Sequence, residues 1–294
     1  MDYTTIFTDL EDFRSYAEGL QADTAYRQLH PSIRTTALEM EKIITKDAFE
    51  AIASGSWTPA ATEEVPEPSA INLSDVKVAL KVALAAGTMY RYQIFASVKR
   101  NGSDASLYKY QHEELKDNYI ENYWKAMDDL LNWLDNNPTV AGYNISPAYK
   151  ERQLLPVKNA DEFERYFGIN RSSFFYAKVL YLIRDSWKAI SARISGYETN
   201  EAIMDAACKA LCYTVMAKVV KRFDLTEFPR SLRFDYNHEY TRGSSTPSRD
   251  ALCADLMAEV TSAMDEVATL IRRLSDNSPT GNTNEEKDKF YFTI

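Results

Sequence analysis

Two pairs of adjacent carboxylates, Glu113–Glu114 and Asp128–Asp129, are the residues of this sequence whose types best suit acid–base chemistry. Two carboxyl groups can act as general acid and general base when their surroundings separate their pKa values. Adjacent acids on a helix, however, usually belong to its solvent-facing side. We therefore expect both pairs to be solvated and to have no catalytic role.

Cysteine and histidine offer metal chemistry only at suitable spacing. Cys208 and Cys212 lie four residues apart and share one face of a predicted helix, but no histidine is near them in the sequence. A di-iron helix bundle needs two Glu-x-x-His sequences, and none of the three histidines follows a glutamate at that spacing. We expect both cysteines to be small core residues and expect no metal site. With Cys253 the chain has three cysteines, too few for a disulfide framework.

Motifs for nucleotide binding and for covalent catalysis are missing from the sequence. There is no G-x-G-x-x-G loop, no P-loop and no G-x-S-x-G nucleophile elbow. We therefore expect a protein that is not an enzyme and that binds no cofactor.

Two segments have a composition that favours contacts with a partner. A loop after residue 225 is basic and aromatic, which suits an acidic partner or nucleic acid, although an ordinary loop anchored by its aromatic residues is the simpler interpretation. The last residues are apolar and β-favouring after a polar stretch, so they can add to a neighbour's sheet edge or pack on their own domain. The candidate contact residues are Arg230, Arg233, Phe234, Tyr236, Tyr240, Arg242, Phe290, Tyr291, Phe292 and Ile294.

Composition favours a helical protein that remains in solution. The 294 residues are 45% hydrophobic and include only 9 Gly and 10 Pro, below the usual shares of roughly 7% and 5%, so long helices are favoured over a β-sandwich. The net charge of −9 argues against general nucleic-acid binding, which requires a positive face. The 19 Tyr suit wide contacts at protein interfaces.

No segment has the pattern of a membrane span or a signal peptide. The start of the sequence, Met1–Thr5, has no basic residue and no apolar run. The most apolar stretch, Ala202–Val220, is interrupted by Asp205, Lys209 and Lys218, whereas a span needs about 20 mostly uncharged residues. We expect a buried helix there, no membrane contact, and a cytoplasmic location.

An internal repeat is the main organising feature of the sequence. Five short blocks recur in the same order at offsets between 127 and 150 residues. Each match is weak alone, but their common order indicates a diverged duplication. The matched blocks are 10–16 with 160–166, 46–52 with 184–190, 83–89 with 210–216, 126–129 with 263–266, and 135–139 with 276–280.

Each copy is predicted to contain four helices. The first is short and begins near Asp9 or Asp161, which we take as N-caps with acidic first turns. The third is apolar nearly all round, so it should occupy the centre of its bundle. The remaining predicted helices are 32–53, 74–98 and 112–136 in the first copy, and 171–194, 200–223 and 249–275 in the second.

The predicted fold is therefore all-α, with two tandem four-helix units in a pseudo-twofold relation and short strand-like segments at their ends. The predicted domains are a first unit at 1–139, a linker with two prolines at 140–157, a second unit at 158–280, and a C-terminal tail at 281–294. The loops at 54–69 and 225–249 carry the largest differences between the copies.

This order of elements resembles a known family. The residues that carry the likeness are Leu10–Tyr16, the aromatic-to-glycine helix ends Phe49–Gly55 and Trp187–Gly196, and the Ala-rich helices Ala83–Arg91 and Ala206–Arg222. They resemble the head–tail connector, or adaptor, proteins of long-tailed bacteriophages and prophages, small helical proteins that form a ring beneath the portal. The resemblance covers about the first three helices of each copy and includes no diagnostic motif.

The resemblance implies a structural protein of virion assembly without catalytic residues, located in the bacterial host cytoplasm or in the virion. Its partners would be copies of itself in a ring, or portal and tail proteins. Because the chain is duplicated, one chain could fill one or two subunit positions of a ring. The alternative is a cytoplasmic helical module that binds and regulates another protein.

Overall fold

The computed structural model describes residues 1–17, 19–20, 23–55, 73–100, 109–224, 227–229 and 249–276. Within these ranges all regular secondary structure is helical, and no strand occurs. The predicted all-α class is confirmed. The predicted strand-like tail, and most of the loops at 54–69 and 225–249, lie outside the described residues.

The chain packs into two compact units. Unit 1 comprises Met1–Leu180 and Phe223–Thr246, and unit 2 comprises Tyr181–Arg222 and Pro247–Ile294. Helix α8 (Ser173–Ser191) begins in unit 1 and ends in unit 2. This division reflects packing, whereas the repeat boundaries at 139 and 158 come from matched sequence blocks, and those boundaries stay a prediction.

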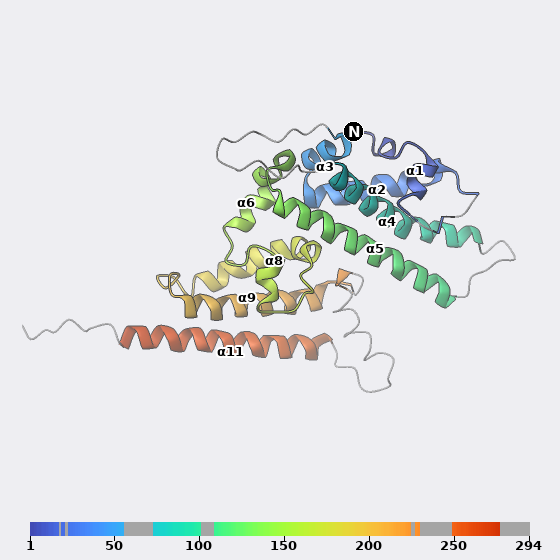
Figure 1. Ribbon diagram of the computed structural model, residues 1–294. Coiled ribbons are helices and arrows are strands. Elements are labelled where there is room, and N and C mark those ends of the chain that lie inside the picture. Colours follow the sequence, from blue (N-terminus) through green and yellow to red (C-terminus); the bar gives the residue numbers. More distant parts are fainter. Residues whose placement is uncertain are drawn as a thin grey trace, which may run out of the picture. The chain divides into compact units, whose positions relative to one another are not determined.

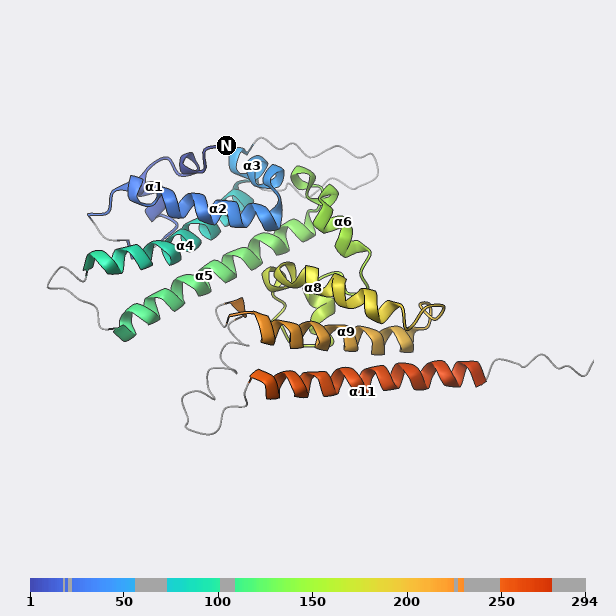
Figure 2. The same cartoon turned by 180° about the vertical axis from the view of Figure 1, so that it is seen from behind.

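Unit 1 is built around the long helix α4 (Leu73–Arg100). It packs against α2 (His30–Ile44) and against α5 (Lys109–Asn136), and both views show α4 running between these two helices (Figure 1, Figure 2). Gly87 permits this close packing, because a Cβ there would lie 2.5 Å from the Thr36 Cγ2 and 2.9 Å from the Tyr123 ring. A short 3₁₀ turn (Tyr3–Thr5), helix α1 (Leu10–Arg14) and a second 3₁₀ turn (Tyr26–Gln28) precede α2.

The helix predicted at 32–53 is two helices, which corrects the prediction. Thr45 has φ 73° and separates α2 from α3 (Lys46–Ser54). A β-branched residue rarely adopts positive φ, so no sequence pattern signals the break. The apolar periodicity survives because Ile33 and Ala37 before the break, like Ala48 and Phe49 after it, are fully buried.

The burial of the two helices predicted to be central is confirmed. On α4, Leu80, Leu84 and Met89 are completely buried. On α9 (Glu201–Arg222), Leu211 and Cys212 are among twelve buried residues. Cys208 is also buried, so both cysteines occupy the core as expected.

The segment predicted as a linker at 140–157 contains structure of its own. It forms a 3₁₀ helix (Val140–Ile145) and α6 (Pro147–Gln153), and α7 (Ala160–Glu164) follows. The Ser146 hydroxyl accepts a hydrogen bond from the Tyr149 N–H and caps α6. Pro147 is therefore the first residue of α6, and Pro156 lies between α6 and α7.

Unit 2 consists, in its described part, of the end of α8, helix α9 and helix α11 (Arg249–Asp276). Helix α9 lies between the other two, with Lys218 donating to the Ser186 hydroxyl of α8 and with α11 packed along its other side (Figure 1, Figure 2). Helices α9 and α11 begin and end within one residue of the predicted ranges.

No helix in the described part of the chain has a stretch long and apolar enough to cross a membrane.

Candidate functional site

All ten predicted contact residues, Arg230 to Arg242 and Phe290 to Ile294, lie outside the described residues. These predictions therefore stay untested. The site must be sought among polar side chains that the described helices bring together, and unit 1 contains such clusters around α1, on α5, and between α5 and α6.

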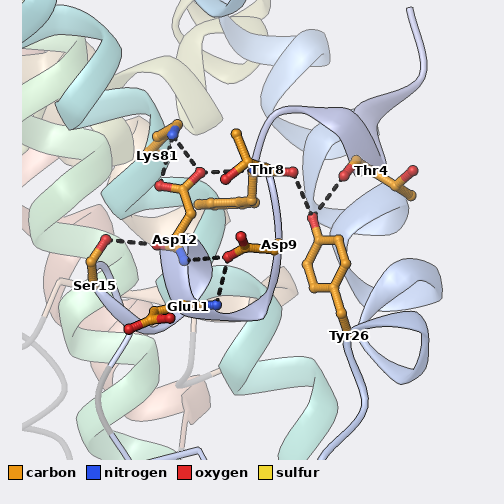
Figure 3. A network of polar contacts seen from close by, with 9 residues as sticks. Thr4, Thr8, Asp9, Glu11, Asp12, Ser15, Tyr26 and Lys81 are labelled. Atoms are coloured by element: carbon orange, nitrogen blue, oxygen red, sulfur yellow. Dashed lines mark hydrogen bonds and ion pairs between the residues drawn. The ribbon is translucent and has the colours of Figure 1, made fainter.

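The first cluster surrounds α1. Asp9 caps the helix by accepting hydrogen bonds from the N–H groups of Glu11 and Asp12, at 2.8 and 2.9 Å. The Asp12 carboxylate accepts from the Thr8 N–H and from Lys81 Nζ of α4, at 2.9 and 2.8 Å. Figure 3 shows Asp12 between these two donors. Since Asp12 joins α1 to α4, the cluster fixes the start of the chain on the central helix.

Lys81 is held from two directions. Its Nζ lies 5.5 Å from the Phe7 ring centroid and 5.1 Å from that of Tyr16, within the range of cation–π attraction. Burial raises the pKa of Asp12, but hydrogen bonds from Lys81 and Thr8 and the lysine's charge lower it more, so the net pKa is below its usual value. The Asp12 carboxylate is held in its ion pair with Lys81, and its lowered pKa makes it a poor general base.

Tyr26 closes the same cluster. Its hydroxyl donates to the Thr4 carbonyl at 2.7 Å and lies 3.3 Å from the Phe7 carbonyl, which ties the chain before α1 to the turn before α2 (Figure 3). Burial, helped by the charges of Asp12, Asp2 and Asp9, raises the pKa of Tyr26 to about 12. The phenol therefore stays protonated and acts as a donor.

Helix α7 repeats the capping arrangement of α1, 150 residues later. Asn159 accepts from the Glu162 N–H at 2.8 Å, and the Lys158 N–H donates to the Glu162 carboxylate, as Thr8 does to Asp12. The N-cap is thus Asn159, and the prediction that Asp161 caps this helix is wrong, since Asp161 lies in the first turn. Phe163, like Phe13, is fully buried.

The second cluster lies on one face of α5, where Asp128 and Asn132 hold the start of α8. Asp128 accepts from the Ser172 hydroxyl and the Phe174 N–H, both at 2.8 Å, and Asn132 accepts from the Ser173 hydroxyl at 2.6 Å. The expectation that Asp128 is solvated is wrong, because it caps a helix that begins 45 residues later.

Burial makes Asp128 an unusual carboxyl group. It raises the pKa to about 6, with Asp129 adding to the increase and the hydrogen bonds from Phe174 and Ser172 opposing it. Asp129 itself is exposed, as expected. A raised pKa in a cleft can mark a general acid, but the donors to Asp128 are the first turn of α8 and the residue just before it, so its role is structural.

The third cluster joins α5 to α6. Arg152 donates from Nη1 and Nη2 to the two oxygens of Asp135, and the Tyr143 hydroxyl donates to the same carboxylate at 3.2 Å. The guanidinium lies 4.5 Å from the Tyr149 ring centroid. Burial lowers the pKa of Arg152, but the hydrogen bond to Asp135 and the charges of Asp135 and the nearby tyrosines together raise it more, so the net pKa is above its usual value.

The hollows beside these clusters are polar and open. One of about 470 Å³ lies between the segment after α1, α4 and α5, with Asn122, Lys125 and Asp129 exposed on its rim. Another of about 450 Å³ is lined by Asn132, Asp135, Asn159 and Ser173, whose side chains already bond within the protein. The described residues also contain no group of three side chains that could ligate a metal. The clusters position segments of the chain, and we assign no ligand to them.

In comparisons with known proteins, no family model matches the sequence, and no curated protein or solved structure matches it either.

Proposed function

We propose that this protein is a non-enzymatic assembly component that acts like a head–tail connector of a tailed bacteriophage or prophage. The observation that supports the proposal is a similar order of helices in the two halves of the chain. Each half begins with a capped helix of five residues, α1 or α7, and ends with a helix of 28 residues, α5 or α11. Between them lie α2, α3 and the long buried helix α4 in the first half, and α8 and the long buried helix α9 in the second.

The series supports a duplication of one four-helix unit, with residues 9–136 and 160–276 as its copies. The matched caps at Asp9 and Asn159 support it locally, because both the cap and the reciprocal acid recur at one offset. The two compact units divide this series within α8, so the likeness is one of chain order and local geometry. Superposition of the two ranges in an experimental structure tests it. Phe49 and Trp187 at different topological positions would reject it.

In this role the contacts would come from the loop at Arg230–Arg242 and from Phe290–Ile294, as the sequence predicts. The partners would be further copies in a ring, or portal and tail proteins, in the host cytoplasm or the virion. The abundance of Tyr suits such interfaces.

A second candidate function is a helical module that binds one cellular protein. Two large apolar side chains favour it, because Leu154 is 83% exposed and Ile145 65% exposed on the segment that Arg152 anchors to α5. Exposed apolar side chains on a fixed support are typical of binding surfaces.

The experiment that tests the proposal is deletion of the gene in its host, followed by electron microscopy of the particles formed on phage induction. A connector is expected to leave filled heads and free tails that do not join, and the wild-type chain to sediment with complete particles. If normal tailed particles form without the protein, the connector role is rejected, and the protein-binding module is the remaining candidate function.

A truncation lacking Phe290–Ile294 then tests the contact segment. We expect unchanged helical content by circular dichroism but no particle assembly. A truncated chain that unfolds would show that the segment packs internally. A truncated chain that folds and assembles normally would show that the segment is not needed, and Arg230–Arg242 would become the candidate contact segment.

A further inference from the structure

Helix α11 carries two adjacent columns of apolar or small residues, and α9 covers only one of them. The covered column includes Ala263 and Val267, which are 1% and 2% exposed. Its contact with α9 is marked by the Cys253 thiol, which donates to the Ala217 carbonyl, and by the ion pair between Glu259 and Lys209.

The second column runs beside the first along α11 and is more exposed to solvent. Its members follow each other at alternating spacings of three and four residues, the pattern by which a helix packs along another helix. Met257 is 45% exposed, three of the others are exposed, and two are partly exposed. The column, here called the outer seam, consists of Ala254, Met257, Thr261, Met264, Ala268 and Ile271.

Small and large side chains alternate strictly along the outer seam. The small residues are Ala254, Thr261 and Ala268, and the large residues are Met257, Met264 and Ile271. Two parallel copies of this helix would place small against small and large against large, leaving gaps and clashes. Two antiparallel copies place a small residue opposite a large one in every layer, as close packing requires.

We infer that the outer seam binds the outer seam of a second copy of this chain, with the two α11 helices antiparallel about a twofold axis at the middle of the helix. The axis lies between Ser262 and Ala263, the midpoint of Arg249–Asp276. Thr261 then meets Met264 of the second copy, Ala254 meets its Ile271, and Ala268 meets its Met257. Such a contact uses the same patch on both chains and closes as a dimer.

Charges beside the seam favour this register. Asp265 is the exposed acid nearest the middle of the seam, and in this register it lies beside Ala258 of the second copy. If each helix shifted by half a heptad, Asp265 would instead lie beside Asp265 of the second copy. At each end, exposed Asp250 comes next to Arg272 of the second copy. The fully overlapped register thus avoids a repulsion at its centre and gains an attraction at each end.

One helix pair is at the small end of stable interfaces, so we expect a dissociation constant on the order of micromolar. Sedimentation velocity of the full chain over a wide concentration range should show a reversible monomer–dimer equilibrium. Ala268→Glu, at an exposed position, places a charge against Met257 of the second copy and should weaken dimerisation roughly tenfold or more. Thr269→Glu, one residue further along and directed away from the seam, is the matched control and should dimerise normally.

Cysteine crosslinking then fixes the orientation. In a Cys253→Ala background, Met257→Cys and Ala268→Cys are prepared as separate proteins, and a disulfide is expected when they are mixed under oxidation. Neither protein should crosslink efficiently alone, because equal positions are far apart in the antiparallel pair. Crosslinking of each variant alone would instead indicate parallel helices and overturn the inference.

The inference goes beyond the proposed function and does not depend on it. A chain that stays monomeric at the highest concentration, or equal weakening by Ala268→Glu and Thr269→Glu, would overturn the outer-seam contact. Failure of the particle experiment would reject the connector role and leave the dimer unaffected.

Discussion

Arg152 and Asp135 form a two-bond ion pair whose arginine is almost entirely buried, between the last turns of α5 and the short helix α6. The Nη1 atom of Arg152 lies 3.0 Å from Asp135 Oδ2, and the rings of Tyr143 and Tyr149 lie near the guanidinium. Because the arginine is shielded from water by these rings, its charge depends on a single carboxylate for compensation. The pair therefore ties the segment after α5 back to the end of that helix.

Asp135→Ala should destabilise unit 1 strongly. It leaves the buried Arg152 charge unpaired, which typically costs about 3–5 kcal/mol. Asp161→Ala is the control, since Asp161 and Arg171 form a 3.6 Å pair with both side chains about three-quarters exposed, and it should cost no more than about 1 kcal/mol. Urea unfolding followed by circular dichroism compares them. Equal effects would mean that the Arg152 pair contributes no more than a surface pair.

Asp128→Asn should change how stability depends on pH. Because the folded pKa is about 6 against an ordinary 3.8, the carboxyl binds its proton more tightly in the folded protein. Its favourable contribution is complete below about pH 4 and is lost as pH rises through 6. Asparagine keeps the acceptor for Phe174 and Ser172 but has no charge to bury.

We therefore expect Asp128→Asn to become more stable relative to wild type as pH rises from 4 to 7, by at most about 3 kcal/mol. Urea unfolding at several pH values measures the difference. Asp128→Ala, which removes the cap, should be less stable than Asp128→Asn at every pH. Parallel pH curves for wild type and Asp128→Asn would show that burial does not raise this pKa.

Gly87→Ala should destabilise the packing of α4 although alanine is the better helix former by about 1 kcal/mol. The new methyl group would meet Thr36 and Tyr123 at distances that require one neighbour to shift. We expect a net loss of about 1–3 kcal/mol. Gly168→Ala is the control, because its Cβ would meet only the end of Glu164 at 3.8 Å. A rise in melting temperature for Gly87→Ala would show that α2 and α5 pack less closely on α4.

Leu84→Asp and Leu211→Asp test the two central helices. Both leucines are completely buried, so each aspartate would place an unpaired charge in the core and cost several kcal/mol. Val78→Asp is the control on α4, because Val78 is 44% exposed, and it should change stability by about 0.5 kcal/mol or less. Thermal melting and soluble yield give the comparison. Unchanged melting of the leucine variants would place these helices outside the core.

The helices were predictable because their signals are periodic. Burial of Leu84 and Leu211 follows from apolar patterns sustained over many residues, and α9 and α11 end where those patterns end. The break at Thr45 was not predictable, since it rests on one residue at positive φ within an uninterrupted pattern. Local rules of sequence do not encode such an exception.

The polar clusters were predictable only in part. The Asp9 cap follows from its place before a helix, because capping is local in sequence. Asp128 and Asp135 instead act on residues brought near by folding, so a single sequence presents them as ordinary surface acids. Asp161 was misassigned as a cap because Asn159, two residues earlier, serves equally well.

The aromatic contacts at the start of α8 give the protein an internal optical reporter. Trp124 is 5% exposed, lies 4.5 Å from the Phe174 ring, and has the Lys178 ammonium 5.4 Å from its own ring. An indole in dry surroundings emits at shorter wavelength than one in water. Trp133 and Trp187 are only partly buried. The short-wavelength part of the tryptophan emission should therefore report whether the start of α8 is packed on α5. A decrease of that emission during unfolding would show when this contact is lost, without any added label.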